Sequence, residues 1–495
     1  MGASLPDPAV VASLTAALDP ARLHELAQRC QVLEVRADLF PEPEAAALRR
    51  EFPGRLLYTL RSAAEGGGFR GGDDERRARL AAAAAAYELV DLELRDVGGS
   101  TLEAVAEEQR VLSWHGSPES EEELHEVAGR LLGVPAYWYK AVTVEPASGP
   151  DRWPLGLLQD LGRRDFIAFA TGETGGWTRL VAPVLGAPAI FAAAGPQAAA
   201  PGQLELARLL EDFAWPPPER VRWIFGLVGR QVADSLSPYV FNRALRRLDL
   251  PGLYVPFHVE SFGEFWLEVV EEGGFAEAGC SLRGLSITAP YKRVAMAVAG
   301  AVSPLADRIR SANTLVFHDG VWEADSTDPE GVLGPLRRRQ IALRGKPAAV
   351  LGAGGAGRAA AHALEQAGLA VTLFNRGAER RRRVARELER PCLPWEELDP
   401  SRFDLVVQAT PLGRDDSDPL PCDPEALPAG GVGLDLVYRR RGATPWVAAL
   451  RAAGRLAIGG REVLLHQAIP QFQAMTGREM PADLVAELLA ELEER

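Results

Sequence analysis

The chain has 495 residues, more than a single hydrophobic core usually supports, so we expect several domains. Apolar residues make up 47% and charged residues 25%, as in ordinary globular proteins. The formal net charge of −14 disfavours nucleic acid as a partner, because an acidic chain repels phosphate backbones. No apolar run approaches the about 18 residues of a membrane span, and the amino-terminal stretch lacks the pattern of a signal peptide.

The cysteines Cys30, Cys280, Cys392 and Cys422 are widely spaced and form no CxxC pair. Zinc ribbons and redox motifs are therefore unsupported, and we expect no bound metal. Scattered single cysteines fit free thiols in a reducing compartment, so we expect a cytoplasmic protein. The sequence does not indicate an oligomeric state.

Short β-rich runs alternate with helical patterns through residues 1–214. We predict strands near residues 8–15, 31–37, 55–61, 87–94, 110–114, 137–144, 165–170 and 188–194, with helices such as 74–87 and 119–132 between them. Eight β-then-α units in this length are typical of a (β/α)8 barrel. The same alternation also fits an open doubly wound sheet, which is the alternative.

Charged side chains recur at the carboxyl ends of six of these strands, where barrel enzymes place their catalytic groups. They are Glu34, Arg36, Asp38, Arg61, Asp91, Glu93, His115, Lys140 and Arg179. Such convergence favours the barrel, because solvated surface charge does not gather on one face. Lys140 interrupts an aromatic strand, where burial would lower its pKa and free the amine as a nucleophile. A lysine that reaches the barrel rim is the alternative.

In their order along the chain, these segments resemble the type I 3-dehydroquinate dehydratase family. The matching pieces are residues 34–38 (EVRAD), 59–62 (TLRS) with 65–67 (EGG), 91–93 (DLE), 113–115 (SWH), Lys140, 178–179 (TR) and 200–203 (APGQ), and they span nearly all of residues 8–205. The resemblance implies that Lys140 forms an imine with the ketone of 3-dehydroquinate, that His115 transfers protons, and that Glu93 orients His115.

The same resemblance implies a role for further polar residues in substrate binding. Arg179 is expected to hold the substrate carboxylate through a bidentate fork, and Glu34, Arg36, Arg61 and Gln203 to bind its other polar groups. The family usually has a serine where this chain has Ala199. We expect that departure to weaken binding by one hydrogen bond without removing the chemistry.

Residues 215–220 read WPPPER, and the three prolines predict a stiff linker between two halves of the chain. Residues 221–330 again alternate strand and helix and are predicted to form a substrate-binding domain. Residues 331–460 carry a nucleotide-binding pattern. Residues 461–495 read as helices, which we expect to pack on the substrate domain.

Ser235 and Ser237 stand next to Pro238, a residue that suits the first turn of a helix. Two hydroxyls at a helix N-terminus can bind a carboxylate, although a simple N-cap is the alternative. Lys292 follows a strand and a proline in RGLSITAPYK, which places it at a loop mouth. By itself it also fits an ordinary exposed lysine.

Residues 348–357 (AAVLGAGGAG) read as a strand that runs into a glycine-rich turn and a helix. The glycines are Gly352, Gly354, Gly355 and Gly357. A second strand follows about 20 residues on, which completes the context of a Rossmann dinucleotide fingerprint. The alternative is a tight glycine turn without a ligand.

The second strand of this pattern ends in Asn375-Arg376 and not in the acid that binds the ribose of NAD. An arginine favours a 2′-phosphate, so we predict NADP, with Arg380 one helical turn on as a second contact. Arginines solvated at the start of a helix are the alternative.

The second half, from residue 222 to about 480, resembles shikimate dehydrogenase. The series comprises residues 235–238 (SLSP), Thr288 with Pro290 and Lys292, 313–314 (NT), 327–328 (TD), 352–357, 375–376, 409–413 (ATPLG), 435–438 (DLVY) and Gln467. The resemblance implies a catalytic pair of Lys292 and Asp328. It also implies that Ser235, Ser237, Thr288, Asn313 and Gln467 bind shikimate, and that Thr410 lies at the cofactor.

Four positions depart from the dehydrogenase pattern: Ser286, Phe241, Arg414 and Val463. They leave open the choice between quinate and shikimate. The combined prediction is a bifunctional α/β enzyme: a TIM barrel that dehydrates 3-dehydroquinate, followed by a two-domain dehydrogenase that reduces 3-dehydroshikimate. The alternatives are an inactive barrel scaffold on an active dehydrogenase, and a NADP-binding regulatory protein without turnover.

Overall fold

The computed structural model describes residues 8–41, 44–97, 100–144, 152–271, 275, 279–342 and 344–495. The chain divides into two compact units. Unit 1 comprises Met1–Arg222 and Phe257–Ser281, and unit 2 comprises Trp223–Pro256 and Leu282–Arg495. The main boundary lies just beyond the predicted linker. However, Phe257–Ser281, which we predicted within the substrate-binding domain, groups with unit 1.

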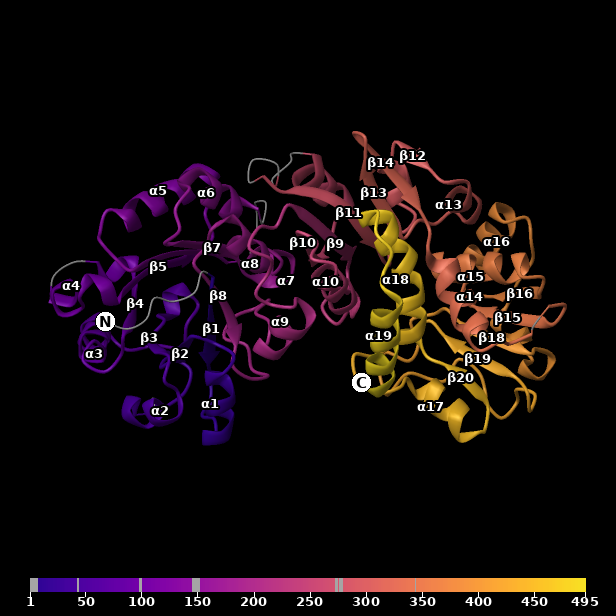
Figure 1. The fold of residues 1–495 in the computed structure, drawn as a ribbon, viewed down its shortest axis with the longest axis horizontal. Coiled ribbons are helices and arrows are strands. Elements are labelled where there is room, and N and C mark those ends of the chain that lie inside the picture. The colour runs from indigo at the N-terminus through magenta and orange to yellow at the C-terminus, as the bar shows by residue number, and fades with distance from the viewer. Residues whose placement is uncertain are drawn as a thin grey trace. The chain divides into compact units, whose positions relative to one another are not determined.

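Unit 1 is built on one parallel sheet (Figure 1). Its strands are β1 (Ala9–Leu14), β2 (Val32–Arg36), β3 (Arg55–Thr59), β4 (Leu89–Glu93), β5 (Arg110–Gly116), β6 (Trp138–Thr143), β7 (Phe166–Ala170) and β8 (Ala189–Ala193). They pair in the order β7-β6-β5-β4-β3-β2-β1-β8, so β1 lies between β2 and β8. This near-closed barrel confirms the (β/α)8 prediction, and the predicted strand positions agree with the observed ones.

Helices follow the strands around the barrel. They are α1 (Pro20–Ala27), α2 (Ala45–Glu51), α3 (Asp73–Ala83), α4 (Ser100–Ala104), α5 (Glu121–Leu132), α6 (Trp153–Leu161), α7 (Gly172–Gly175), α8 (Thr178–Val181) and α9 (Leu206–Asp212). A short 3-10 helix, η1 (Ala63–Glu65), lies in the segment between β3 and α3. The barrel interior is apolar in one layer, where the strands contribute residues such as Val11, Val32, Leu89 and Phe191.

Strand periodicity explains how charged groups come to share that interior. Residues i and i+2 of a strand point to the same face. In β4, Leu89 belongs to the apolar interior cluster, so Asp91 and Glu93 also face inward, nearer the carboxyl end. In β6 the same holds for Trp138 and Lys140. The apolar layer therefore lies below a charged layer at the carboxyl ends of the strands.

Unit 2 contains two sheets (Figure 1). The first has the order β10-β9-β11-β13-β14-β12 and consists of β9 (Trp223–Gly229), β10 (Gly252–His258), β11 (Ser281–Ile287), β12 (Ala301–Val302), β13 (Thr314–His318) and β14 (Val321–Asp325). The helices of unit 2 along this stretch are α10 (Ser237–Arg247), α12 (Ala295–Val298) and α13 (Pro304–Ile309). Within Phe257–Ser281, which belongs to unit 1, lie α11 (Phe262–Phe265) and a π-helix at Trp266–Glu271. Antiparallel pairs of β13 with β11 and β14 make the sheet mixed.

The second sheet is parallel and has the order β17-β16-β15-β18-β19-β20. Its strands are β15 (Pro347–Leu351), β16 (Ala370–Phe374), β17 (Cys392–Leu393), β18 (Leu405–Gln408), β19 (Val432–Asp435) and β20 (Leu456–Ile458), with helices α14 (Asp328–Arg338), α15 (Gly355–Gln366), α16 (Ala378–Glu387) and α17 (Pro445–Ala452). In chain order this is the 3-2-1-4-5-6 arrangement of a Rossmann fold. In such sheets ligands bind where the strand order reverses, which is here between β15 and β18.

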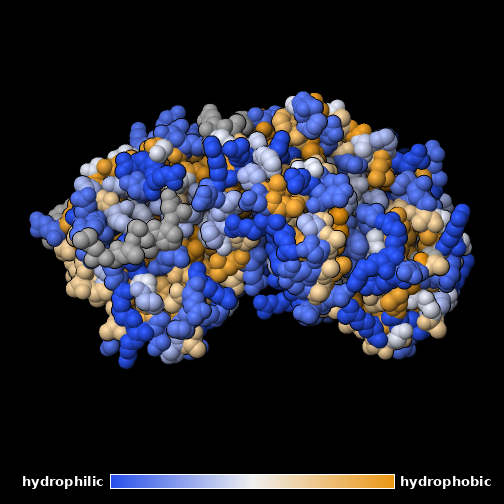
Figure 2. All heavy atoms as spheres, in the orientation of Figure 1, coloured by the Kyte–Doolittle hydropathy of each residue, from blue (hydrophilic) through white to orange (hydrophobic). Residues whose placement is uncertain are grey.

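Two C-terminal helices, α18 (Gly460–Thr476) and α19 (Ala482–Glu494), pack against α10 and β9. Phe472 and Leu488 share a buried cluster with Phe241 and Phe225. The face seen in Figure 2 mixes hydrophilic and hydrophobic residues. Among the described residues, none of the helices has the length and apolarity that a membrane crossing needs.

Candidate active sites

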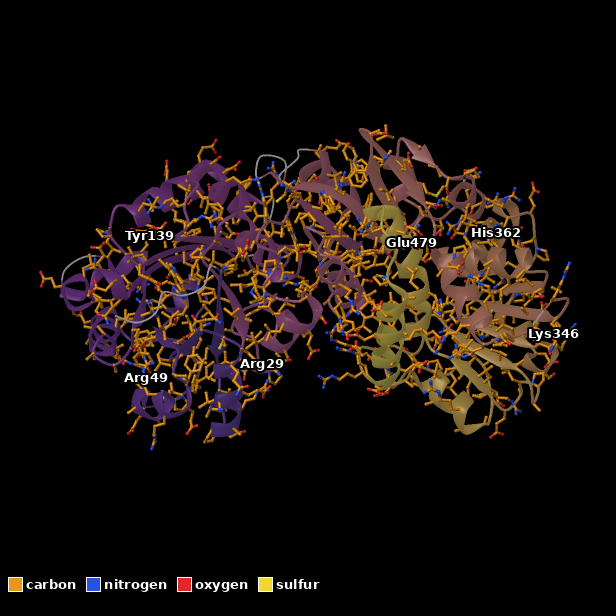
Figure 3. The ribbon with its side chains drawn as sticks, in the orientation of Figure 1. Arg29, Arg49, Tyr139, Lys346, His362 and Glu479 are labelled. Carbon is orange, nitrogen blue, oxygen red and sulfur yellow. The ribbon has the colours of Figure 1, made fainter. Side chains whose placement is uncertain are left out.

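Lys140 is buried at the carboxyl end of the barrel. Its neighbour on β6, Tyr139 (labelled in Figure 3), stacks on Phe166, and Lys140 faces the other way into the interior. The ammonium lies 4.1 Å from the ring centre of Phe191 and 4.0 Å from Oδ2 of Asp91. Burial lowers the pKa of Lys140 to about 8, against the attraction of the nearby carboxylates. The side chain is only 6% exposed and does not reach the barrel rim.

His115 on β5 is held by Glu65. The carboxylate Oε2 lies 3.1 Å from Nδ1 of the ring and accepts a hydrogen bond of 3.1 Å from the backbone N–H of the same histidine. Burial lowers the pKa of His115 well below its usual value and raises the pKa of Glu65 to about 8, a rise that the attraction of Arg61 only partly offsets. A neutral imidazole whose Nδ1 donates to Glu65 keeps Nε2 free to accept a proton.

Glu93 does not orient His115, which corrects the sequence prediction. Its carboxylate accepts 2.7 Å hydrogen bonds from the backbone N–H and the hydroxyl of Ser62, and it lies 3.1 Å from Arg76 and 3.4 Å from Arg61. These contacts tie β4 to the start of η1 and to α3. Glu93 therefore supports the segment that carries Glu65, which is a structural task.

The Glu65 contact was missed because both acids follow strands and only the fold distinguishes them. The available signal was the spacing from Arg61 to Glu65 and the three glycines that follow Glu65. Gly66 has a positive φ of 81° and ends η1, which brings the chain back from Glu65.

Arg179 on α8 is a buried cation without an ion-paired acid among the described residues. Its guanidinium lies 4.2 Å from the ring centre of Phe169, and its Nε has no hydrogen-bond partner in that part of the chain. Burial lowers the pKa of Arg179 to about 9. An unpaired buried guanidinium is costly unless an anion completes it, so this position suits a substrate carboxylate.

A hydrogen-bond chain links the other predicted binding residues and adds Ser13 of β1. Gln203 accepts a 2.7 Å bond from the backbone N–H of Ala199 and donates a 3.0 Å bond to the hydroxyl of Ser13. Ser13 donates a hydrogen bond of 2.5 Å to one oxygen of Glu34, and Thr59 donates a hydrogen bond of 2.9 Å to the other oxygen. Sequence reasoning missed Ser13, whose one signal was a hydroxyl in the apolar run AVVASL.

Two predicted binding arginines already have partners in the barrel. Arg36 forms a fork onto Asp38, with bonds of 2.9 and 2.8 Å, and donates 3.2 Å to the carbonyl of Ala199. Arg61 lies 2.8 Å from Asp91 and 3.1 Å from Glu65. Both therefore hold the walls of the site as well as lining it.

In unit 2, Lys292 donates a 2.5 Å hydrogen bond to Oδ2 of Asp328. The other oxygen of Asp328 accepts a hydrogen bond of 2.9 Å from the side-chain amide of Asn313. The same amide donates hydrogen bonds of 3.0 Å to Gln467 and of 3.0 Å to Thr327. Asp328 begins α14 directly after Thr327, and Asn313 precedes β13. Four predicted residues from separate segments are therefore brought into one polar cluster.

The two predicted serines lie at the start of α10. The hydroxyl of Ser235 donates 3.2 Å to that of Ser237 and lies 3.3 Å from the hydroxyl of Tyr438, which follows β19. The contact adds Tyr438 to the candidate site. Thr288 follows β11, and a Cβ on Gly229 would lie 2.3 Å from its methyl carbon, so the two backbones approach closely.

Two departures from the family pattern are structural. Ser286 accepts 2.7 Å from the hydroxyl of Tyr254 and donates 2.7 Å to Gln471 of α18. Phe241 stacks on Tyr254 with ring centres 4.3 Å apart, within the core. Both positions therefore anchor α18 and α10 beside the cluster.

The glycine-rich turn fits a dinucleotide. Gly352 has a φ of +110°, and a Cβ on Gly357 would lie 1.9 Å from the carbonyl oxygen of Gly352, so neither position accepts a side chain. Gly354 faces open space, with no atom within 4 Å of the position of a Cβ. The turn therefore leaves room for a pyrophosphate at the N-terminus of α15.

Gly355 has a different task within the same turn. A Cβ there would lie 2.5 Å from the hydroxyl of Ser311 and 3.2 Å from Cδ of Lys292. The absent side chain thus lets the nucleotide turn approach the stem of Lys292. This contact joins the two sheets of unit 2 at the candidate site.

At the end of β16, Asn375 is buried and Arg376 is exposed. The guanidinium of Arg376 lies 5.7 Å from the ring centre of Trp395, and Arg381 donates 2.9 and 2.6 Å bonds to the carbonyls of Asn375 and Arg376. Arg380 is exposed on α16. Arg381 therefore stabilises the turn, while the guanidinium groups of Arg376 and Arg380 stay accessible.

Thr410 follows β18 at the predicted crevice. Its hydroxyl donates a hydrogen bond of 2.9 Å to Oε1 of Gln408. The same oxygen accepts a hydrogen bond of 2.9 Å from the backbone N–H of Thr410. These bonds shape the loop after β18, next to Gly352. Among the described residues no group of three His, Cys, Asp or Glu side chains is arranged to hold a metal ion.

Comparisons with known proteins agree with the family resemblance of each half of the chain. Residues 9–215 match the family model for type I 3-dehydroquinase, and residues 227–315 match that for the shikimate dehydrogenase substrate binding domain. A shikimate dehydrogenase (NADP(+)) of Acidiphilium cryptum (strain JF-5) is 38% identical over 256 residues, which are 51% of this chain and 90% of that protein. The chain belongs to the shikimate dehydrogenase family. It carries a type I 3-dehydroquinase domain as well.

Two further similarities accompany this result. A shikimate dehydrogenase (NADP(+)) of Thermus thermophilus is 37% identical over 255 residues, 51% of this chain and 92% of that protein. A structure of dehydroquinate dehydratase and shikimate dehydrogenase from S. pombe AroM is 22% identical and covers 98% of both chains, with a TM-score of 0.44. The family matches confirm the two resemblances found in the sequence, so the chain combines a lyase domain and an oxidoreductase domain.

Proposed function

We propose that unit 1 dehydrates 3-dehydroquinate to 3-dehydroshikimate and that unit 2 reduces 3-dehydroshikimate to shikimate with NADPH. The observation that carries the first step is that the barrel interior holds the buried Lys140, the His115–Glu65 pair and Arg179, which has no ion-paired acid among the described residues. For the second step it is the Lys292–Asp328 pair beside a turn that fits a dinucleotide. Both substrates are small anions, and a reducing cytoplasm suits four free thiols.

In the barrel, the neutral amine of Lys140 attacks the substrate ketone to give a carbinolamine. The carbinolamine hydroxyl takes up the proton that the lysine ammonium released and leaves as water, so an iminium remains. His115 Nε2 then removes a proton from the adjacent carbon. The electron pair forms a carbon–carbon double bond as the hydroxyl on the next carbon departs and takes a proton from His115 to leave as water. Arg179 holds the carboxylate throughout, and Glu65 fixes the ring of His115.

In unit 2, the substrate lies between the serines of α10 and the cluster around Lys292. NADPH, when bound at the glycine turn, supplies a hydride. Lys292 donates a proton to the reacting oxygen, and Asp328 holds Lys292 in place. Asn313 and Gln467 position Asp328 and offer hydrogen bonds to the substrate hydroxyls.

The test of the whole proposal is NADPH oxidation by the full chain with 3-dehydroquinate as the only carbon substrate. Two active units will oxidise NADPH with either 3-dehydroquinate or 3-dehydroshikimate. An inactive barrel scaffold would respond to 3-dehydroshikimate alone, and a NADP-binding regulatory protein would respond to neither. The first of these two results would overturn the dehydration step, and the second would overturn both steps.

Glu65→Gln is expected to lower kcat for dehydration by about 10²-fold with little change in KM, because the amide no longer orients and polarises His115. The matched control is Glu93→Gln, which removes another acid of the barrel, one that is fully buried and contacts Arg61 and Arg76. That control should lower the free energy of unfolding by about 3 kcal/mol and affect kcat less. Steady-state kinetics and urea unfolding of both variants check the assignment, and a reversed order of kcat effects would return the role to Glu93.

Arg376→Ala is expected to remove most of the preference for NADP over NAD. Charge-assisted bonds to a 2′-phosphate are worth roughly 1.5–3 kcal/mol each, so the wild type should favour NADP by at least about tenfold in kcat/KM. The control is Arg382→Ala, which removes another exposed arginine of α16. Equal use of both cofactors by the wild type, or an equal effect of the control, would count against the assignment.

A further inference from the structure

The charged layer of the barrel contains one carboxylate oxygen without a hydrogen-bond partner in the described chain, Oδ2 of Asp91. Asp91 is 1% exposed. Its Oδ1 accepts 2.8 Å from Arg61 and 2.6 Å from Ser113. These two bonds fix the carboxyl group so that Oδ2 lies 4.0 Å from Nζ of Lys140.

We propose that Asp91 is the counter-ion of the iminium formed on Lys140. This inference rests on the proposed imine chemistry and assigns the charge that the intermediate requires. Conversion of an ammonium and a ketone to an iminium and water conserves one positive charge at the nitrogen. In a buried site such a charge is stable only beside a fixed negative partner.

The other acids of the layer are occupied elsewhere. Both oxygens of Glu34 accept hydrogen bonds, from Ser13 and Thr59. Glu93 is held by Ser62, and Glu65 by His115 and Arg61. Asp91 alone combines a free oxygen with proximity to the Lys140 nitrogen among the described residues. The ring of Phe191 covers that nitrogen at 4.1 Å and shields the pair from solvent.

The charges that act on this pair come from several strands. Glu34 of β2 and Asp91 of β4 raise the pKa of Lys140, whereas Arg36 of β2 and Arg61, which follows β3, lower it. Arg36 and Arg61 also lower the pKa of His115 on β5. The pKa of Asp91 is lowered by Arg61, Lys140 and Arg76 of α3. Burial would raise the pKa of Asp91, but Arg61 and Lys140 hold it below its usual value. Asp91 is thus ionised over the whole working range of pH.

The test compares wild type, Asp91→Asn and Glu93→Gln by the pH dependence of kcat/KM for dehydration, with borohydride trapping at saturating 3-dehydroquinate. Loss of an opposite charge at this distance lowers a lysine pKa by about one unit or more, so Asp91→Asn should move the midpoint down from about 8. Its kcat should fall at least about tenfold, with less trapped adduct, because the iminium loses its partner. Glu93→Gln should keep the midpoint of the wild type.

Asp91→Ser removes the same charge with a smaller side chain, and serves if the asparagine variant does not fold. An unchanged midpoint in a folded charge-deleted variant would overturn the counter-ion assignment, even if that variant is less stable. A shift of equal size in Glu93→Gln would do the same. Absence of a trapped adduct in wild type would overturn the imine itself, whereas a normal adduct with an unmoved midpoint overturns only the role of Asp91.

Discussion

Lys140→Ala is expected to lower dehydration of 3-dehydroquinate by at least about 10⁴-fold, because it removes the nucleophile of a covalent mechanism. The same substitution should leave shikimate oxidation unchanged, since unit 2 has its own cluster around Lys292. Both activities can be assayed on one purified preparation. The intact dehydrogenase activity then serves as an internal measure of active protein.

Two measurements on the wild type complete this prediction. Borohydride added with 3-dehydroquinate should reduce the iminium and add the substrate mass irreversibly at Lys140. The pKa of Lys140 is lowered to about 8, and the reactive form is the neutral amine. Hence kcat/KM should fall about tenfold per pH unit below 8 and level off above it. A Lys140→Ala enzyme that dehydrates at the normal rate would exclude an imine at this residue.

Lys292→Ala is the second large effect, with an expected fall in kcat for shikimate oxidation of about 10²- to 10⁴-fold. The reason is that proton transfer to or from the reacting oxygen occurs in the transition state, so kcat changes more than KM. Dehydration by unit 1 should be unaffected. Stopped-flow or steady-state measurement of NADPH formation, with both substrates saturating, gives the comparison directly.

Lys346→Ala is the matched control for this variant. Lys346, labelled in Figure 3, lies in the same unit immediately before β15 and pairs with Asp404 at 3.4 Å on the surface. It is half-exposed, so its loss should change neither activity nor stability by much. An undiminished kcat in Lys292→Ala, or an equal loss in Lys346→Ala, would remove Lys292 from the proposed chemistry.

The spacing of apolar runs and the placement of glycines in the sequence are enough to predict the architecture without any tertiary contact. Eight short apolar runs separated by helical stretches predicted the barrel strands within a few residues. The segment from β15 to β16 predicted the Rossmann unit, because a strand, a glycine turn and a helix have few other uses in that order. Such signals are local: each depends on residues close together in the chain.

Residue type and position after a strand also predicted much of each candidate site. Lys140 was marked by the cost of an ammonium among aromatic residues, and the structure places it at the end of β6, buried. In unit 2, Lys292 and Asp328 were identified by resemblance, and they form an ion pair across 36 residues of chain. Neither the burial of Lys140 nor the Lys292–Asp328 ion pair follows from spacing alone, because the sequence does not state which strand ends meet.

Only the tertiary structure decided how the polar groups are paired. Glu65 and Glu93 both follow barrel strands and look equivalent in sequence, yet η1 carries Glu65 back to His115 while Glu93 supports Ser62. Ser13 lies 190 residues from Gln203, and Tyr438 lies 203 from Ser235. The chain by itself determined the elements and the chemical groups at their ends. The choice of partners needed the fold, because a hydrogen bond depends on distances of about 3 Å between segments that are remote in sequence.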